Sequence, residues 1–252
     1  MCEYLHSHNS LDREAFPLVS WHSISRALDQ RSPSFRAWMT KHVSGHCGVG
    51  SKMRAWGFWD NDQCPCCGMA DETTRHLPLC TAQHMVDEYD KQTLSLIQWM
   101  SDSHTHPGII DYFTTALTHK ALPSTVPIEH ASDLQQAMAN QSKIGWDNLF
   151  FGRIADSWRS IQRQHLLSTP SRRSAETWTA DFIYHLLQFS HSLWLCRNNY
   201  VHQRDAQGLL LKDGQTLQES ITHYYQKGTR PLLVQDHHLI NNRSLQDLLK
   251  RP

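Results

Sequence analysis

Hydrophobic residues recur at steps of three and four over much of the chain, which is the spacing of one face of an α-helix. The longest run covers 178–200 and predicts a single helix of about seven turns. Stripes of the same period predict further helices over 81–100, 109–117 and 149–161. The pattern therefore predicts a mainly α protein.

The amino-terminal half contains a second kind of pattern between its helices. Residues 20–48 are predicted to be helical, with Pro33 in the first turn of a helix that Gly45 and Gly48 would end. The segment KMRAWGFWDNDQC, residues 52–64, follows, and its aromatic residues alternate in part. Partial alternation predicts a small hairpin at this place.

The segment SDSHTHPG, residues 101–108, interrupts the hydrophobic pattern and is where we place the main boundary. The expected organisation is a region 1–106, with amino-terminal helices and a small hairpin-and-helix unit, followed by a helical domain 107–252. Within the second domain, 215–228 and 244–251 are predicted to form shorter helices.

Composition narrows the classes of protein to consider. The 252 residues are 39% apolar, enough for one large or two modest domains. Lysine plus arginine equals aspartate plus glutamate, 24 each, so any attraction to nucleic acid or to an anionic membrane must be local. The sequence has no apolar run near the ~18 residues of a membrane span and no signal-peptide pattern at its amino terminus. We expect an intracellular protein.

Cysteine usage directs attention to one segment. The chain has seven cysteines, an odd number, and four of them lie in CPCCGMADETTRHLPLC, residues 64–80. Such clustering favours metal binding over a disulfide framework. Cys64 and Cys67 form a C-x-x-C pair, a spacing that lets one tight turn place two thiolates ~2.3 Å from a single zinc ion. Pro65 suits that turn, and Gly68 can take the positive φ that aims backbone N–H groups at the sulfurs.

The same segment contains two further candidate ligands. His76 and Cys80 are four residues apart, so on a helix they would share a face. Cys66 lies between two inward-turned ligands, and we expect its side chain to point away. The segment thus predicts one structural Zn²⁺ bound by Cys64, Cys67, His76 and Cys80. The alternatives are a metal-free group of buried, reduced cysteines with a surface histidine, and a redox-active pair.

The string WGFWDNDQCPCCGMADETTRHLPLC resembles the zinc-binding region found downstream of the polymerase in reverse transcriptases of non-LTR-type retroelements. The pattern there is C-P-x-C, an acidic residue with threonine, and then H-x-x-x-C. The preceding FRAWMTKHVSGHCGVGSKMRAWG is similar to the helix and turn that lead into that region. LWLCRNNYVH resembles a W-x-x-R-N-x-x-x-H segment that closes many such chains, and the matching positions are Trp194, Arg197, Asn198 and His202.

The resemblance implies an accessory module of retroelement origin that binds RNA or DNA beside a polymerase part. The chain departs from the family in one respect, because no Tyr-x-Asp-Asp polymerase signature is present. The acidic residues also lack the pattern of a magnesium-dependent nuclease. We therefore expect a non-catalytic protein.

Residues 31–59 contain five cations and no aspartate or glutamate, although the whole chain is neutral. Five aromatic residues, three of them tryptophan, are interleaved with these cations. Cations that neutralise phosphates and rings on which bases stack are the two components of single-strand binding. The expected contacts are Lys41, Lys52, Arg54 and Trp56. Alternatively, the rings form the small core of the zinc unit and the cations are a solvated face.

Trp194, Arg197, Asn198 and His202 lie along one side of the predicted long helix. They are candidates for a phosphate or base contact, or for a buried polar network between helices. Two function classes follow from these observations. One is a zinc-containing module that binds single-stranded or structured nucleic acid, and the other is a protein-interaction or scaffold module with a purely structural zinc.

Overall fold

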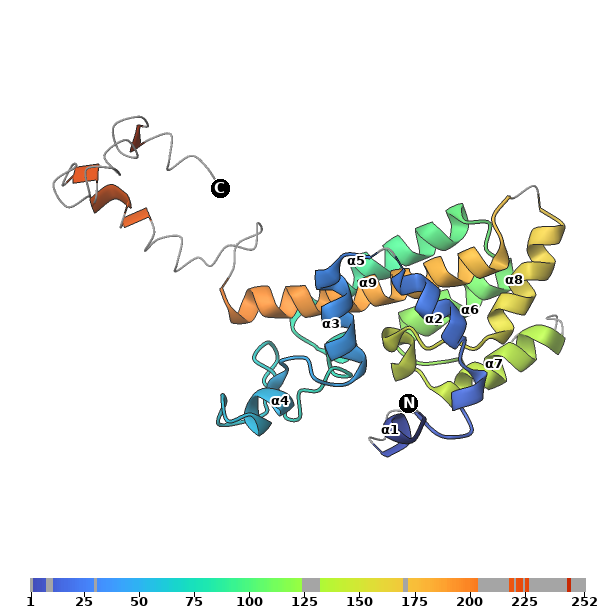
Figure 1. The fold of residues 1–252 in the computed structure, drawn as a ribbon, viewed down its shortest axis with the longest axis horizontal. Coiled ribbons are helices and arrows are strands. Elements are labelled where there is room, and N and C mark those ends of the chain that lie inside the picture. The colour runs from blue at the N-terminus through green and yellow to red at the C-terminus, as the bar shows by residue number, and fades with distance from the viewer. Residues whose placement is uncertain are drawn as a thin grey trace. The chain divides into compact units, whose positions relative to one another are not determined.

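The computed structural model describes residues 2–7, 11–29, 31–123, 132–169 and 172–203, with short pieces at 218–219, 221–223, 225–226 and 244–245. All regular elements in these residues are helical, and an isolated antiparallel bridge joins Val19 to Ala155. The mainly α class is therefore confirmed (Figure 1). The elements are α1 (Cys2–Ser7), η1 (Phe16–Leu18), α2 (Trp21–Leu28), α3 (Pro33–Val43), α4 (Gly50–Ala55), η2 (Leu77–Leu79), α5 (Gln83–Asp102), α6 (Pro107–His119), α7 (Ser132–Ile144), η3 (Asp147–Phe151), α8 (Ser157–Leu167) and α9 (Ala175–Val201), where η marks a 3-10 helix.

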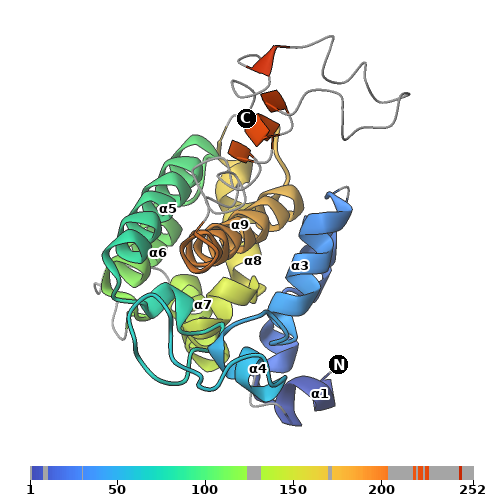
Figure 2. The ribbon, with the colours of Figure 1, turned by 90° about the vertical axis from the view of Figure 1, so that its left-hand side faces the viewer.

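The long helix α9 is the centre of the hydrophobic core. Figure 2 shows it almost end-on, with α5 and α6 on one side and α3 on the other. The Trp99 ring of α5 stacks on the Phe182 ring of α9, and the Phe113 ring of α6 contacts the Phe182 ring edge-on. Fully burying such a side chain contributes about 1.5–3 kcal/mol, and the half-buried Trp99 contributes less. The apolar face that predicted α9 therefore also organises its neighbours.

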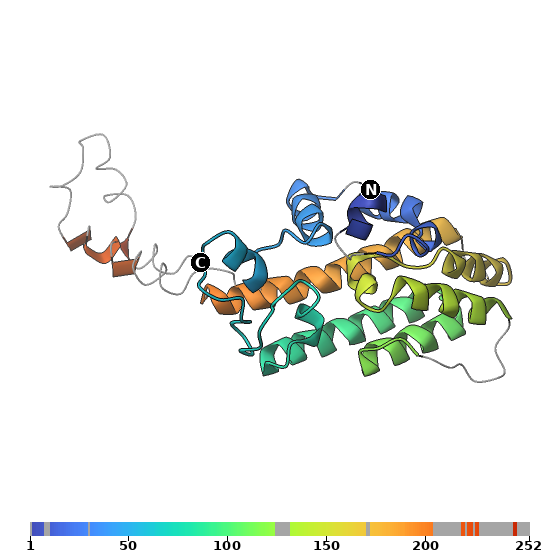
Figure 3. The ribbon, with the colours of Figure 1, turned by 90° about the horizontal axis from the view of Figure 1, so that it is seen from below.

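Two predicted helices begin and end close to where their signals lie. α3 starts at Pro33, and the Phe35 N–H donates to the Ser32 side chain at 3.2 Å, which caps the first turn. After α3 the chain turns at Gly45, where φ is +69°. The stripe over 81–100 becomes α5 (Figure 3). In these segments local signals and tertiary packing agree.

The single helix predicted over 149–161 is wrong. The chain forms the 3-10 helix η3, turns at Gly152 with φ +70°, and starts α8 only at Ser157. Hydrogen bonds of the buried Arg153 side chain keep the intervening segment from becoming helical. This side chain donates to the Asn148 side chain and to the Val43 carbonyl. The hydrophobic stripe alone could not reveal these long-range partners.

The hairpin predicted over 52–64 is also wrong. Gly50–Ala55 forms the short helix α4, and the chain then runs without regular structure to η2. Two backbone bonds still bring this loop back on itself, from Glu72 N–H to the Asp62 carbonyl and from Cys64 N–H to the Met69 carbonyl. The loop is therefore folded, but it contains no described strand.

The chain divides into two compact units, Met1–Cys196 and Arg197–Pro252. The boundary expected near residue 106 falls inside the first unit, where α5 and α6 pack together across it (Figure 2). The short helices predicted at 215–228 and 244–251 lie for the most part outside the described residues. None of the described helices has the length and apolar character needed to cross a membrane.

Candidate metal centre

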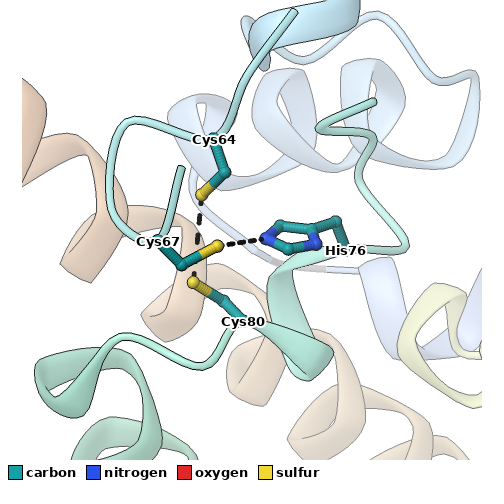
Figure 4. A group of neighbouring side chains, drawn as sticks. All are labelled: Cys64, Cys67, His76 and Cys80. Atoms are coloured by element: carbon teal, nitrogen blue, oxygen red, sulfur yellow. Dashed lines mark hydrogen bonds between the residues drawn. The ribbon is translucent and has the colours of Figure 1, made fainter. Parts of the chain in front are cut away.

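Four side chains from the loop after α4 converge on one point. Cys64, Cys67, His76 and Cys80 offer ligand atoms that all lie within 4.8 Å of one another (Figure 4). Cys64 and Cys80 are 2% exposed, and the other two residues are half-buried. Among the described residues, this cluster of three cysteines and one histidine is the arrangement of side chains that could hold a metal ion. Its members are the four residues that the sequence predicted.

The distances within the group fit a tetrahedral ion. Two thiolates bound ~2.3 Å from zinc at a tetrahedral angle lie about 3.8 Å apart. The Cys64 and Cys80 sulfurs are 3.8 Å apart, and the Cys67 sulfur is 3.3 Å from His76 Nε2. The histidine therefore presents Nε2 to the centre. Three sulfurs and one imidazole nitrogen are a donor set typical of a closed structural zinc site.

The turn after Cys64 holds the first ligand pair in the expected way. Gly68 has φ +76°, and its N–H donates to the Cys64 carbonyl at 2.8 Å. The backbone N–H groups of Cys66 and Cys67 donate to the Cys64 sulfur. These N–H groups stabilise a thiolate, so the turn prepares this ligand for a cation.

The expectation that the Cys66 side chain points away is wrong. Its interaction with the Cys64 sulfur is the largest cause that holds the pKa of the Cys64 thiol well below its usual range, with further contributions from His76 and the backbone. The Cys64 sulfur in turn raises the pKa of His76, while burial raises the pKa of the Cys80 thiol. Protons and a metal ion therefore compete for one compact set of donors.

The segment between the second and fourth ligands is not the α-helix that the spacing of His76 and Cys80 suggests. His76 ends a turn, Leu77–Leu79 forms η2, and Cys80 has extended backbone with ψ 131°. Pro78 lacks the N–H that an α-helix would need there. The short η2 nevertheless places His76 and Cys80 opposite Cys64 and Cys67, so the four ligand atoms converge (Figure 4).

Glu72 is a structural residue of this centre that sequence reasoning missed. Its side chain is fully buried, and one carboxylate oxygen accepts from the Gly50 N–H at the first turn of α4 at 2.5 Å. The Glu72 carbonyl also accepts from the Ser51 N–H at 3.0 Å. A carboxylate at a helix amino terminus is electrostatically favourable, so Glu72 fastens the ligand loop to α4. An acidic residue between metal ligands was the available signal, but its partner lies 22 positions away.

The predicted nucleic-acid contacts do not form one group. Lys41 lies on the exposed side of α3, whereas Lys52 and Arg54 belong to α4. Arg54 pairs with Asp62 at 2.6 Å, so part of its charge is neutralised. Trp56 is 46% exposed directly after α4, and Phe58 is 72% exposed. We call Trp56 and Phe58 the aromatic platform.

The four residues predicted as a polar network divide into two sets. In the first unit, Trp194 turns toward α3, with its ring centroid 6.3 Å from that of Trp38. In the second unit, buried Arg197 donates to the Asn198 side chain at 3.1 Å, while His202 is exposed. The Arg197–Asn198 bond is a local polar contact on α9.

Comparison with family models, with curated proteins and with solved structures finds no match to this chain.

Proposed function

We propose that this chain is a non-catalytic zinc-binding module of retroelement origin that binds single-stranded nucleic acid through the aromatic platform. The observation that carries it is a contrast within one loop: the four metal ligands are buried or half-buried, while Trp56 and Phe58, a few residues before them, remain exposed. A group of exposed apolar side chains is one signature of an interaction site. The alternative of a protein-interaction module makes the opposite prediction in the test below.

Zinc is the proposed ion because its preferences match the donors. Cys₃His with sulfur separations near 3.8 Å suits a d¹⁰ ion that takes sulfur and nitrogen ligands in a tetrahedron. Four protein ligands leave no position for a water molecule, so the proposed role is to stabilise the fold and not to catalyse a reaction. A zinc ion held in this way can contribute on the order of 10 kcal/mol to folding the loop.

The metal is proposed to support the platform through α4. Glu72, which lies between the ligands Cys67 and His76, bonds the first turn of α4, and Arg54 in the last turn pairs with Asp62. Both contacts connect the helix to the ligand loop. Trp56 and Phe58 follow α4 directly. Binding of the metal would therefore fix the position of both rings at the end of this helix. Preorganised rings lose less entropy when bases stack on them.

The expected ligand is a single strand because its bases are free to stack. Base stacking on an aromatic side chain contributes ~1–3 kcal/mol per base. Lys52, in the same short helix as Arg54, is half-buried and has no carboxylate within salt-bridge distance among the described residues, which leaves its charge for phosphate. The resemblance of residues 64–80 to the retroelement zinc region supports the same ligand class.

The test is a filter-binding titration of the metal-loaded protein with single-stranded RNA and DNA over a salt series. Lys52→Gln should flatten the slope of log affinity against log salt by about 0.7 per lost phosphate contact. Arg54→Gln is the matched control in the same helix and should change the slope less, because Asp62 already neutralises that charge. Trp56→Ala and Phe58→Ala should each weaken binding ~5–150-fold at an unchanged slope.

Tyr4→Ala removes another exposed ring, 40% exposed on α1, and should leave binding unchanged. Zinc content and circular dichroism of each variant show whether its fold is intact. Absence of binding by the parent at low salt contradicts the nucleic-acid role and favours the scaffold role. Equal losses for Tyr4→Ala and Trp56→Ala would also contradict the proposed platform.

A further inference from the structure

A pocket of about 600 Å³ lies between α3 and α9, within the first unit and apart from the metal ligands. Its walls carry the rings of Phe35 and Trp38 from α3 and of Tyr184, His191 and Trp194 from α9. Figure 2 shows the two helices side by side. Volumes of 300–1,000 Å³ with aromatic walls and a few polar groups are typical of small-ligand sites.

The rings in this pocket contact one another in edge-on, tilted and stacked arrangements, but they are not sealed from solvent. Phe35 meets Tyr184 and His191 with centroid distances of 5.6 and 5.4 Å, at steep interplanar angles of 69° and 89°. All rings except that of Trp38 are half-buried. Parallel and perpendicular ring faces that remain partly open can receive a planar ligand by stacking.

One end of the pocket is positively polarised. Arg31, Ser32 and Ser34 line it, and they lead into the first turn of α3, an 11-residue helix. Pro33 has no N–H and the Phe35 N–H is capped by the Ser32 side chain, so the Arg31 guanidinium is the charged group that this end offers to an anion. The Arg31 guanidinium lies 3.5 Å from the centre of the Tyr184 ring, and its Nε–H donates to the Ala27 carbonyl. These contacts fix the cation at the pocket edge.

Two buried hydrogen-bond donors in the walls lack acceptors. The indole N–H groups of Trp38 and Trp194 are enclosed and meet no acceptor in the described part of the chain. Trp38 is 6% exposed. Buried donors nearly always have a partner, and leaving one unmade costs about 1–3 kcal/mol. Both N–H groups are enclosed by protein atoms, so the pocket presents the rings of these tryptophans to a ligand and not their N–H groups.

We propose that the α3–α9 pocket binds a nucleotide, with the base against the partly exposed faces of the aromatic walls and the phosphate at Arg31. None of the described residues that line the pocket is acidic. A cationic ligand such as a quaternary ammonium is disfavoured, because Arg31 already occupies the face of Tyr184 and repels a second cation. Burial also lowers the pKa of His191, which leaves an uncharged ring for stacking.

This site would extend the proposed nucleic-acid role to a second surface. None of the candidate metal ligands lines it. The pocket proposal rests on the proposed nucleic-acid role only in its choice of a nucleotide as the ligand. Mononucleotides test it separately, because a mononucleotide can bind the pocket whether or not an oligonucleotide binds the aromatic platform.

The experiment follows the tryptophan indole N–H signals of ¹⁵N-labelled, zinc-loaded protein by NMR at constant ionic strength. The probes are AMP, adenosine, inorganic phosphate, choline and a proline-rich peptide. Trp38→Phe and Trp194→Phe assign the two signals, since each variant removes one. We expect AMP to shift both signals to saturation, adenosine to bind about 10-fold more weakly, and choline to cause no shift.

Arg31→Gln should weaken AMP binding about 10-fold, to the level of adenosine. Arg36→Gln is the matched control, because Arg36 is an exposed cation on the same helix that does not line the pocket. AMP that shifts neither indole signal overturns the proposal, as do equal losses for the two arginine variants. Tighter binding of choline or of the proline-rich peptide would also overturn it. AMP binding here without oligonucleotide binding would contradict the aromatic platform alone.

Discussion

The Glu72 carboxylate accepts a hydrogen bond from the Gly50 N–H at 2.5 Å, and this contact joins the metal-ligand loop to the first turn of α4. The two backbones also approach closely, because a Cβ added at Gly50 would lie 2.6 Å from the Asp62 carbonyl oxygen. Gly50 is therefore required by space and not by its φ. Close approach lets the buried carboxylate reach the helix without a water molecule between them.

Gly50→Ala should loosen α4 and the metal loop together. The new methyl group would meet backbone atoms of Asp62, which cannot rotate away, so we expect a loss of about 1–3 kcal/mol in the free energy of unfolding. Zinc affinity should fall as well. Gly48→Ala is the matched control, because its Cβ would meet only the Met53 sulfur at 3.4 Å. Denaturant unfolding with and without zinc measures both effects. Equal stability of the two variants would contradict the close-approach account.

His42 should make the fold sensitive to mild acid. Burial lowers its pKa to about 4, although its bond to the Phe150 carbonyl at 2.8 Å opposes the shift, and Arg153 and His191 lower the pKa further. An unfolded histidine titrates near pH 6.5. Because the folded pKa is depressed, the unfolded chain alone binds this proton between pH 6.5 and 4. Stability is therefore lost as the pH falls through that window, by on the order of 3 kcal/mol.

The His42→Gln variant isolates this contribution. Glutamine can still donate to the Phe150 carbonyl but does not titrate, so its unfolding free energy should fall less between pH 6.5 and 4 than that of the parent. His46→Gln, at an exposed position, should follow the parent. All three proteins keep the same metal ligands, so loss of the metal in acid cancels in the comparison. Parallel curves for His42→Gln and the parent would show that His42 takes up its proton in the folded state.

Cys66 should be dispensable for the metal although its thiol contacts Cys64. Its sulfur is outside the group of four converging ligand atoms, so Cys66→Ser should keep the zinc content and lower the affinity by about 10-fold, the low end for a residue that supports a ligand. Cys67→Ser, one residue away, removes a ligand and should lose the metal. Competition with a chromogenic chelator measures both affinities. If Cys66→Ser lost the metal while Cys67→Ser kept it, the assignment of the turn would be wrong.

Features fixed by neighbouring residues could be predicted from the sequence. The candidate metal ligands follow from the C-x-x-C pair and from His76 and Cys80 nearby, and α9 follows from its hydrophobic period. The start of α3 follows from Ser32 and Pro33, because a cap and a first-turn proline act within one helical turn. In each of these cases the signal lies within one short stretch of the chain.

Features fixed by distant residues could not be predicted. The turn at Gly152 depends on Arg153 reaching Val43, 110 positions away, and the α3–α9 pocket depends on Arg31 meeting Tyr184. The Cys66 thiol shows that local geometry can also mislead, because the tight turn brings its sulfur back to Cys64. Spacing predicted which residues converge into a group that could hold a metal ion, but not which residues support them.

The most direct test of the account is the metal itself. Elemental analysis of the purified protein should find one zinc per chain, and X-ray absorption should find three sulfur atoms at ~2.3 Å and one nitrogen at ~2.0–2.1 Å. Cys80→Ser should lower the zinc content and replace one sulfur. A protein that contains no zinc, or whose zinc keeps a water ligand in place of one of the four side chains, would contradict the closed structural centre.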